Sequence, residues 1–419
     1  MTLLLWIDDI IIAFLRYIVK YHIYKRALPC YNNKKPKGGV TVQTKKYSLT
    51  EGSIWKAMLL FAMPVFLSNL FQQLYNAFDA WCVGNYIGDN ALAAVSSSGS
   101  LIFLLIGFFN GLAMGAGVVI ARAYGAKDYD TMSKSVHTAI AFGLVCGAAL
   151  TVVGVSLTPL ILRWMGTPSE VLPRSVEYFR YYFMGALFTV MYNIFVGIFH
   201  AVGDSRHPLY YLIISTFVNI VLDILFVAVL GFGVGAAAMA GCGSYSKLEG
   251  FAFLPVMCFS QALSTFVGQN LGAGNHTRTK KGAIFGIVCG CAMAEVIGVL
   301  SYIFAPRLIG FFTDSAESIA LGTQHMRTIC LFYCLLAFSH CAAGVLRGAG
   351  KAMVPMLTML IIWCVVRVNY ITAAVRIVNK LTTVSSAYPL TWSLSGIVFI
   401  IYLLKADWIH NFDKKEQGT

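Results

Sequence analysis

Long apolar stretches with few charges recur along the whole of this 419-residue chain. Ten of them approach or exceed the roughly 20 residues that a helix needs to cross a bilayer. They lie at about 55–82, 93–120, 135–162, 176–200, 208–232, 250–271, 282–306, 326–346, 353–375 and 387–404. Backbone polar groups find no water inside a bilayer, and the ten-residue alternation of a barrel does not occur, so these stretches must be helices. The sequence predicts an all-α polytopic membrane protein with about ten transmembrane helices.

The composition excludes an ordinary soluble domain, because only 12% of the residues are charged, against about 25% in soluble proteins. The net charge of +13 would suit a nucleic-acid partner, but most of the lysines and arginines lie before the first span, in alternate connections between the spans, or after the last span. By the positive-inside rule those connections are cytoplasmic. We therefore expect a multi-pass protein of the cell inner membrane, with both termini in the cytoplasm and no nucleic-acid partner.

The first 26 residues, MTLLLWIDDIIIAFLRYIVKYHIYKR, are apolar but interrupted by Asp8, Asp9 and Arg16. They lack the basic start and the small-residue cleavage site of a signal peptide, and their charges do not suit a clean span. An interfacial helix or an appended segment fits better. We expect residues 1–46 to form an interfacial or disordered extension that does not cross the membrane.

A shift of 147 residues brings the chain into register with itself. It pairs YGAKD at 124 with LGAGN at 271, Pro159 with Pro306, and GIFHAVGDSRHP at 197 with GVLRGAGKAMVP at 344. The matched segments hold equivalent places between successive spans. This predicts two related bundles that point the same way, the parallel repeat of some transporters. We expect the glycines of the GAKD and GAGN segments to end helices in left-handed caps.

The same shift leaves the first and last spans without counterparts. The first bundle then has no sixth helix and the second has no first, so the repeat implies a parent of twelve helices from which two central ones are missing near residues 234–243. Because two is an even number, the loss of two helices leaves the orientation of all later spans in the membrane unchanged. The predicted lobes are 47–235 and 236–405, with five helices each, followed by a cytoplasmic tail at 406–419.

Several of these motifs resemble one family over a region from about residue 47 to about residue 405. MPVFLSNLFQQLYNAFDAWCVG, FVNIVLDILF and SKLEGFAFLPVMCFSQALSTFVGQNLGAGN are similar to the multidrug and toxic compound extrusion (MATE) family, in its branch similar to DNA-damage-inducible protein F. The resemblance implies two six-helix lobes around a central cavity. It also implies an antiporter that exports drug-like, often cationic compounds in exchange for Na⁺ or H⁺. The amino-terminal segment and the two missing helices depart from the family pattern.

Polar side chains stand inside two of the spans. A charge at the bilayer centre costs about 2.5 to 3.5 kcal/mol, so Asp223 is expected to face the interior of the bundle, with Asn219 one helical turn away on the same face. A second stripe runs along one side of the span at 55–82 and consists of Gln72, Tyr75, Asn76 and Asp79. Counted from the cytoplasmic ends, the two carboxylates fall in the outer half of their helices. They can meet at one depth.

Two carboxyl groups in a dry pocket repel each other when both are ionised, and burial also disfavours the charge, so at least one pKa should rise toward the working range. A group poised there can release a proton or bind a cation. The resemblance assigns this cation-coupling role to Asp79, Asn219 and Asp223. The alternative is that these groups are structural and join helices by hydrogen bonds. The repeat offers no second set, because Val366 and Tyr370 stand at the counterparts of Asn219 and Asp223.

Gln72, Tyr75 and Asn76 are expected to line the cavity, and Tyr192 and Asn193 either line it or pack against neighbouring helices. No cofactor is expected beyond Na⁺ or H⁺ as coupling ion, and the eleven cysteines contain no Cys-x2-Cys pair that would suggest a metal site. The chain contains no catalytic motif, so an enzyme is not expected. The expected partners are a small organic substrate and the bilayer, with the protein as a monomer. A rearranged chain that inserts without transporting, and a lipid-linked substrate flippase of the same superfamily, remain alternatives.

Overall fold

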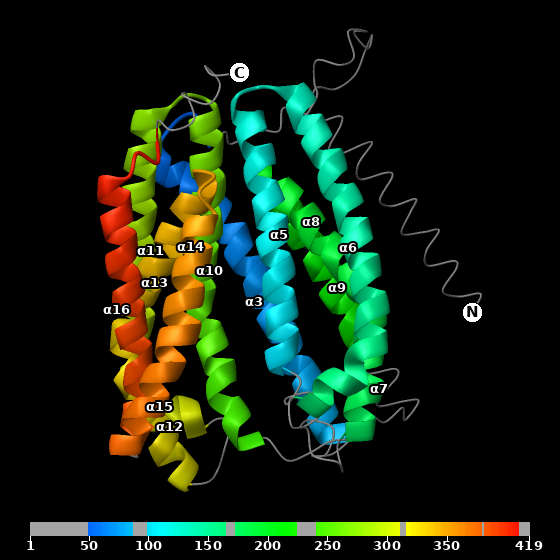
Figure 1. Cartoon of the computed structure of the whole chain (residues 1–419), viewed down its shortest axis with the longest axis vertical. Helices are drawn as coiled ribbons and strands as arrows, with labels where there is room; N and C mark the ends of the chain where they lie inside the picture. Colours follow the sequence, from blue (N-terminus) through cyan, green and yellow to red (C-terminus); the bar gives the residue numbers. More distant parts are fainter. Residues whose placement is uncertain are drawn as a thin grey trace, which may run out of the picture.

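The computed structural model describes residues 49–86, 99–164, 172–223, 240–310, 316–378 and 381–409, and the regular structure within these ranges is helical. In the first half the helices are α3 (Ile54–Tyr86), α5 (Gly99–Gly125), α6 (Tyr129–Trp164), α7 (Leu172–Met184), α8 (Ala186–Ala201) and α9 (Arg206–Asp223) (Figure 1). In the second half they are α10 (Ala240–Gly272), α11 (His276–Gly310), α12 (Ala316–Ile329), η3 (Cys330–Phe332), α13 (Tyr333–Gly348), α14 (Met353–Met359), the π-helical turn η4 (Leu360–Val366), α15 (Arg367–Ile377) and α16 (Leu381–Lys405).

Each of the ten predicted spans coincides with one of these helices or with an adjoining group of them. Within the described ranges six helical segments are long and apolar enough to cross a membrane. They are Ile54–Leu74, Tyr129–Trp164, His276–Gly310, Ile319–Gly348, Met353–Ile377 and Thr382–Lys405. The pair Ser175–Met184 and Ala186–Ala201, bent by 48°, makes a seventh if it is one span. The prediction of an all-α polytopic membrane protein is confirmed.

The 147-residue repeat is visible in the helix boundaries. α6 begins at Tyr129 and α11 at His276, while α8 and α13 both begin and end 147 residues apart. The connections agree as well, because Gly203 and Gly350 both have positive φ, at 82° and 73°. The two halves therefore share one backbone plan, and α3 and α16 have no counterpart under the shift.

The turns after α5 and α10 share the backbone hydrogen bonds donated by residues 126–128 and 273–275. The amide of Asp128 donates to the carbonyl of Ala123 at 2.9 Å, and the amide of Asn275 donates to the carbonyl of Asn270 at 2.8 Å. The left-handed residue is Gly274 in the second turn, at φ 70°, and Lys127 in the first, at φ 59°. The expected left-handed glycine is therefore found in one turn only, because the first repeat carries a lysine at that position.

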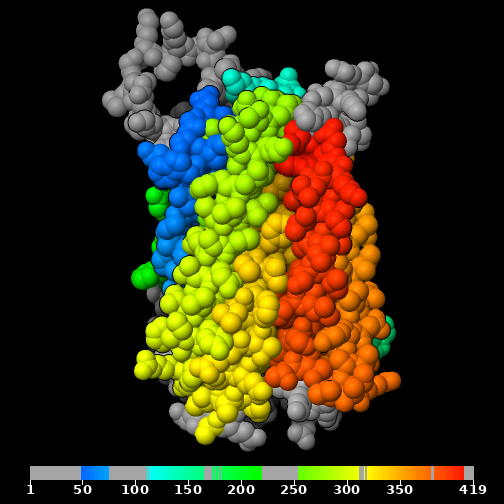
Figure 2. Space-filling view, turned by 90° about the vertical axis from the view of Figure 1, so that its left-hand side faces the viewer, coloured from blue at the N-terminus to red at the C-terminus, as the bar shows by residue number. Residues whose placement is uncertain are grey.

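α10 is the central helix of the molecule, and it packs against α3 and α5 on one side and α11 and α13 on the other. Figure 2 shows the face on which the start of α3 lies beside the helices of the second half. The apolar core there joins Met58, Phe61 and Val65 of α3 to Leu263 and Phe266 of α10. A separate core joins α5, α6 and α8.

Several predictions fall outside the described residues. The amino-terminal extension 1–46, the predicted lobe boundary at residues 235 and 236, and most of the tail at 406–419 lie there. For these segments the sequence predictions stand as predictions.

Candidate functional site

The helices that carry the predicted coupling residues lie side by side. Asp79 is in α3, Asn219 and Asp223 are in α9, and these two helices pack against each other. The side chains of these three residues, and of Tyr75 and Asn76, lie outside what the structure describes. The structure therefore brings the two backbones together, and the meeting of the carboxylates stays a prediction.

The other predicted cavity residues have different environments. Gln72 and Tyr192 are exposed on their helices. Asn193 is half-buried, and its side-chain nitrogen donates to the carbonyl of Thr189 at 2.8 Å, within α8. Of these three residues, Asn193 alone lines the pocket described next.

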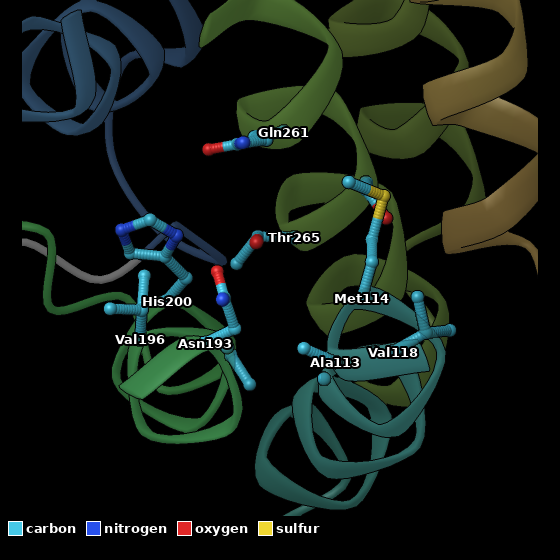
Figure 3. A pocket seen from close by; sticks show the side chains of 12 residues that line it. Ala113, Met114, Val118, Asn193, Val196, His200, Gln261 and Thr265 are labelled. Carbon is cyan, nitrogen blue, oxygen red and sulfur yellow. The ribbon is translucent and has the colours of Figure 1, made fainter. Parts of the chain in front are cut away.

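A small pocket lies where α5, α8 and α10 meet, between the two halves of the molecule (Figure 3). Its volume is about 60 Å³. Its walls are Ala113, Met114, Gly117 and Val118 from α5, Asn193, Val196, Gly197, His200 and Ala201 from α8, and Gln261, Ser264 and Thr265 from α10. A water needs about 10 to 15 Å³ by this kind of measure, whereas drug-sized ligands occupy pockets of about 300 to 1,000 Å³. This space admits a few waters or an ion and excludes a drug-like molecule.

The pocket is polar on two of its walls. Asn193 and His200 reach it from α8, and Gln261 and Thr265 reach it from α10. The Nε2 atom of His200 is buried without a hydrogen-bond partner among the described residues, and the ring meets Phe61 edge-on at 5.6 Å. Such groups favour ordered water, because a buried polar atom left unpaired is costly.

Sequence reasoning missed the α10 wall of this pocket. Gln261, Ser264 and Thr265 stand at i, i+3 and i+4 inside an apolar span, the spacing of one helical face. These residues form a polar stripe inside an apolar span, as the polar residues of the span at 55–82 do.

Beside the pocket, α5 and α10 cross with their backbones in contact. A Cβ atom on Gly125 would overlap the carbonyl oxygen of Gln269, and one on Gly272 would overlap the carbonyl oxygen of Arg122. Both pairs are related by the 147-residue shift, so each helix offers its last glycine to the other. Since no side chain fits between them, the two halves are closed against each other at this end.

Two polar side chains of the second half reach across to the first. Gln269 is fully buried, and its Nε2 atom donates to the carbonyl of Ala201, at the end of α8, at 2.7 Å. Arg278 of α11 holds the chain that leads into α3, donating to the carbonyls of Leu49 at 3.1 Å, Glu51 at 2.8 Å and Gly52 at 2.5 Å. Arg278 thus forms a latch between the halves at the start of α3.

The second half has a polar seam of its own, along α16. Arg367 donates to the hydroxyl of Thr391 through Nη2 at 2.7 Å and lies over the rings of Trp363 and Tyr388 at 5.3 and 4.6 Å. Tyr370, the counterpart of Asp223, bonds the hydroxyl of Ser386 at 3.0 Å. The second half therefore presents a guanidinium and a phenol where the first half has Ile220 and Asp223.

Comparison with known proteins gives concordant results. The MatE family model matches residues 64–225 and 222–371. The chain is 26% identical to the probable multidrug resistance protein YoeA of Bacillus subtilis strain 168 over 393 residues, covering 74% of this chain and 85% of that protein. It is 24% identical to the probable multidrug resistance protein YpnP of the same strain over 395 residues, covering 77% and 89%.

A solved structure described as the outward-facing conformation of a multidrug resistance MATE family transporter of the MOP superfamily superposes with a TM-score of 0.77. The sequence identity is 20%, and the match covers 86% of this chain and 97% of that one. At this identity the likeness shows the fold.

The sequence alignments also reveal a difference in length. The 393-residue alignment to YoeA takes in 74% of a 419-residue chain, about 310 residues. The relative therefore carries about 80 residues without a counterpart, enough for two spans of about 20 residues each with their connections. The alignment to YpnP, 395 residues against 77% of this chain, shows a similar excess.

Proposed function

The chain belongs to the multidrug and toxic compound extrusion (MATE) family, and from that premise we propose that it is an antiporter exporting drug-like, often cationic organic compounds in exchange for Na⁺ or H⁺. Membership makes it a membrane transporter rather than an enzyme. The relatives named as multidrug resistance proteins support drug export as the activity.

The observation that carries the proposal is the reciprocal glycine crossing of α5 and α10. Alternating access in parallel-repeat transporters is largely a rocking of one bundle against the other. A narrow contact to which both halves contribute equally suits such rocking, because neither half has to be deformed when the other turns. The contacts of Gly125 with Gln269 and of Gly272 with Arg122 have these properties, and the latch at Arg278 closes the same interface.

In this proposal the driving cation binds in the first lobe, to Asp79, Asn219 and Asp223. The packing of α3 against α9 supports the assignment, because it places the two carboxylate-bearing helices next to each other. Binding of Na⁺ or H⁺ would neutralise charge that the bilayer disfavours. The affinity of this site for the cation is then the link between the ion gradient and the rocking of the lobes.

The setting follows from the charge pattern. We place the protein in the cell inner membrane as a monomer, with both termini in the cytoplasm and the lobes divided at residues 235 and 236. For the amino-terminal extension at 1–46 we keep the expectation that it is interfacial or disordered and does not cross the membrane. The substrate of the transporter is a small organic molecule taken from the cytoplasm or the inner leaflet.

A second candidate is a chain that inserts but does not transport. The length difference favours it, because the relatives contain about 80 residues that this chain lacks, the length of two spans. Without them the rocking interface would have fewer helices on one side.

Export from liposomes distinguishes the two candidates. The purified chain is reconstituted with a fluorescent organic cation, and export is followed after a Na⁺ or H⁺ gradient is imposed. Asp223→Asn keeps the size and hydrogen bonding of the side chain but removes its charge, so we expect it to insert normally and lose gradient-driven export. Tyr370→Phe, at the matched position of the second half, is the control.

Equal export by Asp223→Asn and the parent across about pH 6 to 8 would contradict the coupling role. No export by the parent under either gradient, with export by a version that carries two restored central helices, would establish the second candidate. In that restored version the Asp223→Asn comparison still tests the coupling site.

A further inference from the structure

An open groove of about 500 Å³ runs between α5 and α6 on the first half of the molecule. Its walls are Gly111, Gly115, Ala116 and Val119 from α5, Thr131, Lys134, Ser135, Thr138, Ala139 and Phe142 from α6, and Ile194 from α8. No described element of the chain covers it. Val119 and Phe142 are 51% and 48% exposed there, although both are apolar.

The repeat shows what the matching surface of the second half does. Adding 147 to Gly111, Gly115, Ala116 and Val119 gives Cys258, Ala262, Leu263 and Phe266, none more than 1% exposed. These residues are covered by α3, whose Met58 lies against Leu263 and against Gly286 of α11. The groove of the first half is the same surface without its covering helix, because the shift places no helix over it.

The floor of the groove is open down to the backbone. A Cβ atom added to Gly111 or Gly115 would meet nothing within 4 Å. In a membrane-spanning chain the groove faces hydrocarbon, and the open space at the two glycines can take an alkyl chain.

The groove changes character at the end that lies beside the turn after α5. Lys134 and Ser135, in the second turn of α6, face that end, and Lys134 is exposed. In the second half the matching residues are Lys281 and Gly282, and the chain before α3 takes up the donors of Arg278 there. The first half thus keeps a cation and a hydroxyl next to an apolar channel, the distribution of charge that an anionic phospholipid complements.

We infer that an anionic phospholipid occupies this groove, with its phosphate at Lys134 and Ser135 and one acyl chain along Gly111, Gly115 and Phe142. The lipid takes the place that α3 takes on the second half. It would seal the half of the molecule from which a covering helix is missing.

The test uses the full chain in phosphatidylcholine bilayers with trace spin-labelled phosphatidylglycerol, and it measures the immobilised fraction of the label by electron spin resonance. Lys134→Gln should lower the preference for phosphatidylglycerol over phosphatidylcholine about fivefold, the contribution of one lysine near a membrane surface. Lys281→Gln, at the matched position of the second half, should leave that preference unchanged. An unchanged preference in Lys134→Gln would overturn the headgroup assignment.

The acyl-chain site is tested by filling it. Gly111→Leu with Gly115→Leu should abolish the extra immobilised component for both lipids, whereas Ala148→Leu, on an exposed part of α6 outside the groove, should not. An unchanged component in the double variant would overturn the proposal and leave the groove to the chain's own amino-terminal segment. A molar mass by light scattering that falls from dimer to monomer in the double variant would also overturn it, because a second copy would then be the occupant.

Discussion

The two halves of the molecule follow one backbone plan but are covered to different extents. α8 and α13 are matched helices of sixteen residues each. Seven residues are buried in α8 and eleven in α13. The neighbours explain the difference, since α13 packs against α10, α11 and α16, while α8 has α5 and α6 as its main partners. Of the two matched helices, the one with more helices around it is the more buried.

The comparison also shows what a sixth helix supplies. On the second half, α16 provides the hydroxyls that bond Arg367 and Tyr370. On the first half the shift places no such helix beside α9. We therefore expect Asp223 to depend on α3, or on a bound cation, for the partners that Tyr370 finds on α16.

The largest effect is expected where the halves touch. Gly125→Ala and Gly272→Ala each place a methyl group on a backbone carbonyl of the other helix. Backbone cannot move aside as a side chain can, so each variant should lose more than about 4 kcal/mol of stability or fail to fold. Thermal unfolding in detergent measures this, with Gly115→Ala as the control, since its methyl group meets open space. If one substitution is tolerated and the other is not, the two glycine contacts between α5 and α10 are not equivalent.

A smaller effect is expected on the polar seam of the second half. Thr391→Val keeps the shape of a fully buried side chain but removes the oxygen to which Arg367 donates at 2.7 and 3.1 Å. A hydrogen bond to a charged group is worth about 1.5 to 3 kcal/mol, so the melting temperature should fall accordingly. Thr151→Val removes a hydroxyl that donates to the carbonyl of Gly147 in its own helix, and it should change the melting temperature little. Equal effects of the two substitutions would mean that α16 is not needed to satisfy Arg367.

The latch distinguishes the halves at the start of α3. Arg278→Gln removes the guanidinium that binds the carbonyls of Leu49, Glu51 and Gly52, whereas the matched residue of the first half is Thr131. We expect a loss of about 1 to 2 kcal/mol, because the bonds are charge-assisted but partly exposed. Hydrogen exchange of residues 49–52 should become faster. Lys280→Gln, at an exposed neighbouring residue, serves as the control. Unchanged hydrogen exchange in Arg278→Gln would show that Arg278 does not hold residues 49–52 in place.

The smallest effect concerns pH and the turn before α9. Burial by itself would raise the pKa of Asp204, but the hydrogen bonds and charge of His207 and the amide of Arg206 hold that pKa below its ordinary value. The carboxylate contacts the His207 ring nitrogen at 2.6 Å. Because its pKa is lowered on folding, its contribution is present above the unfolded value of about 4 and is lost as pH falls below it.

We expect Asp204→Asn to cost at most about 1 kcal/mol near neutral pH and to flatten the fall in melting temperature between about pH 5 and 3. The matched Lys351→Gln should leave that fall unchanged. If Asp204→Asn has the melting temperature of the parent at every pH, the contact between Asp204 and His207 does not contribute to stability. The two turns would then be equivalent in stability although Lys351 stands in place of Asp204.

The sequence predicted the spans and the repeat because both depend on local patterns. Apolar run length and the recurring turn residues placed the helix boundaries of α6, α8, α11 and α13 closely. The crossing was not predicted, because Gly125 and Gly272 were interpreted as helix-ending caps. Their use in a contact between helices 147 residues apart is a tertiary property. The α10 wall of the pocket was within reach, since Gln261 and Thr265 form a polar face that the sequence displays.

Lys127, in the turn after α5, bears on how the two halves of the chain are related. A residue with a Cβ atom costs about 1 to 2 kcal/mol in the left-handed region, yet Lys127 adopts φ 59° where Gly274 adopts 70°. The hydrogen bonds donated by the amides of residues 126–128 and of residues 273–275 agree pairwise within about 0.1 Å all the same. Two copies of one ancestral segment have therefore drifted apart in side chains while inheriting a single backbone. The backbone conformation of the turn is therefore kept even by a residue that does not favour it, and the fold already accommodates a Lys127→Gly substitution.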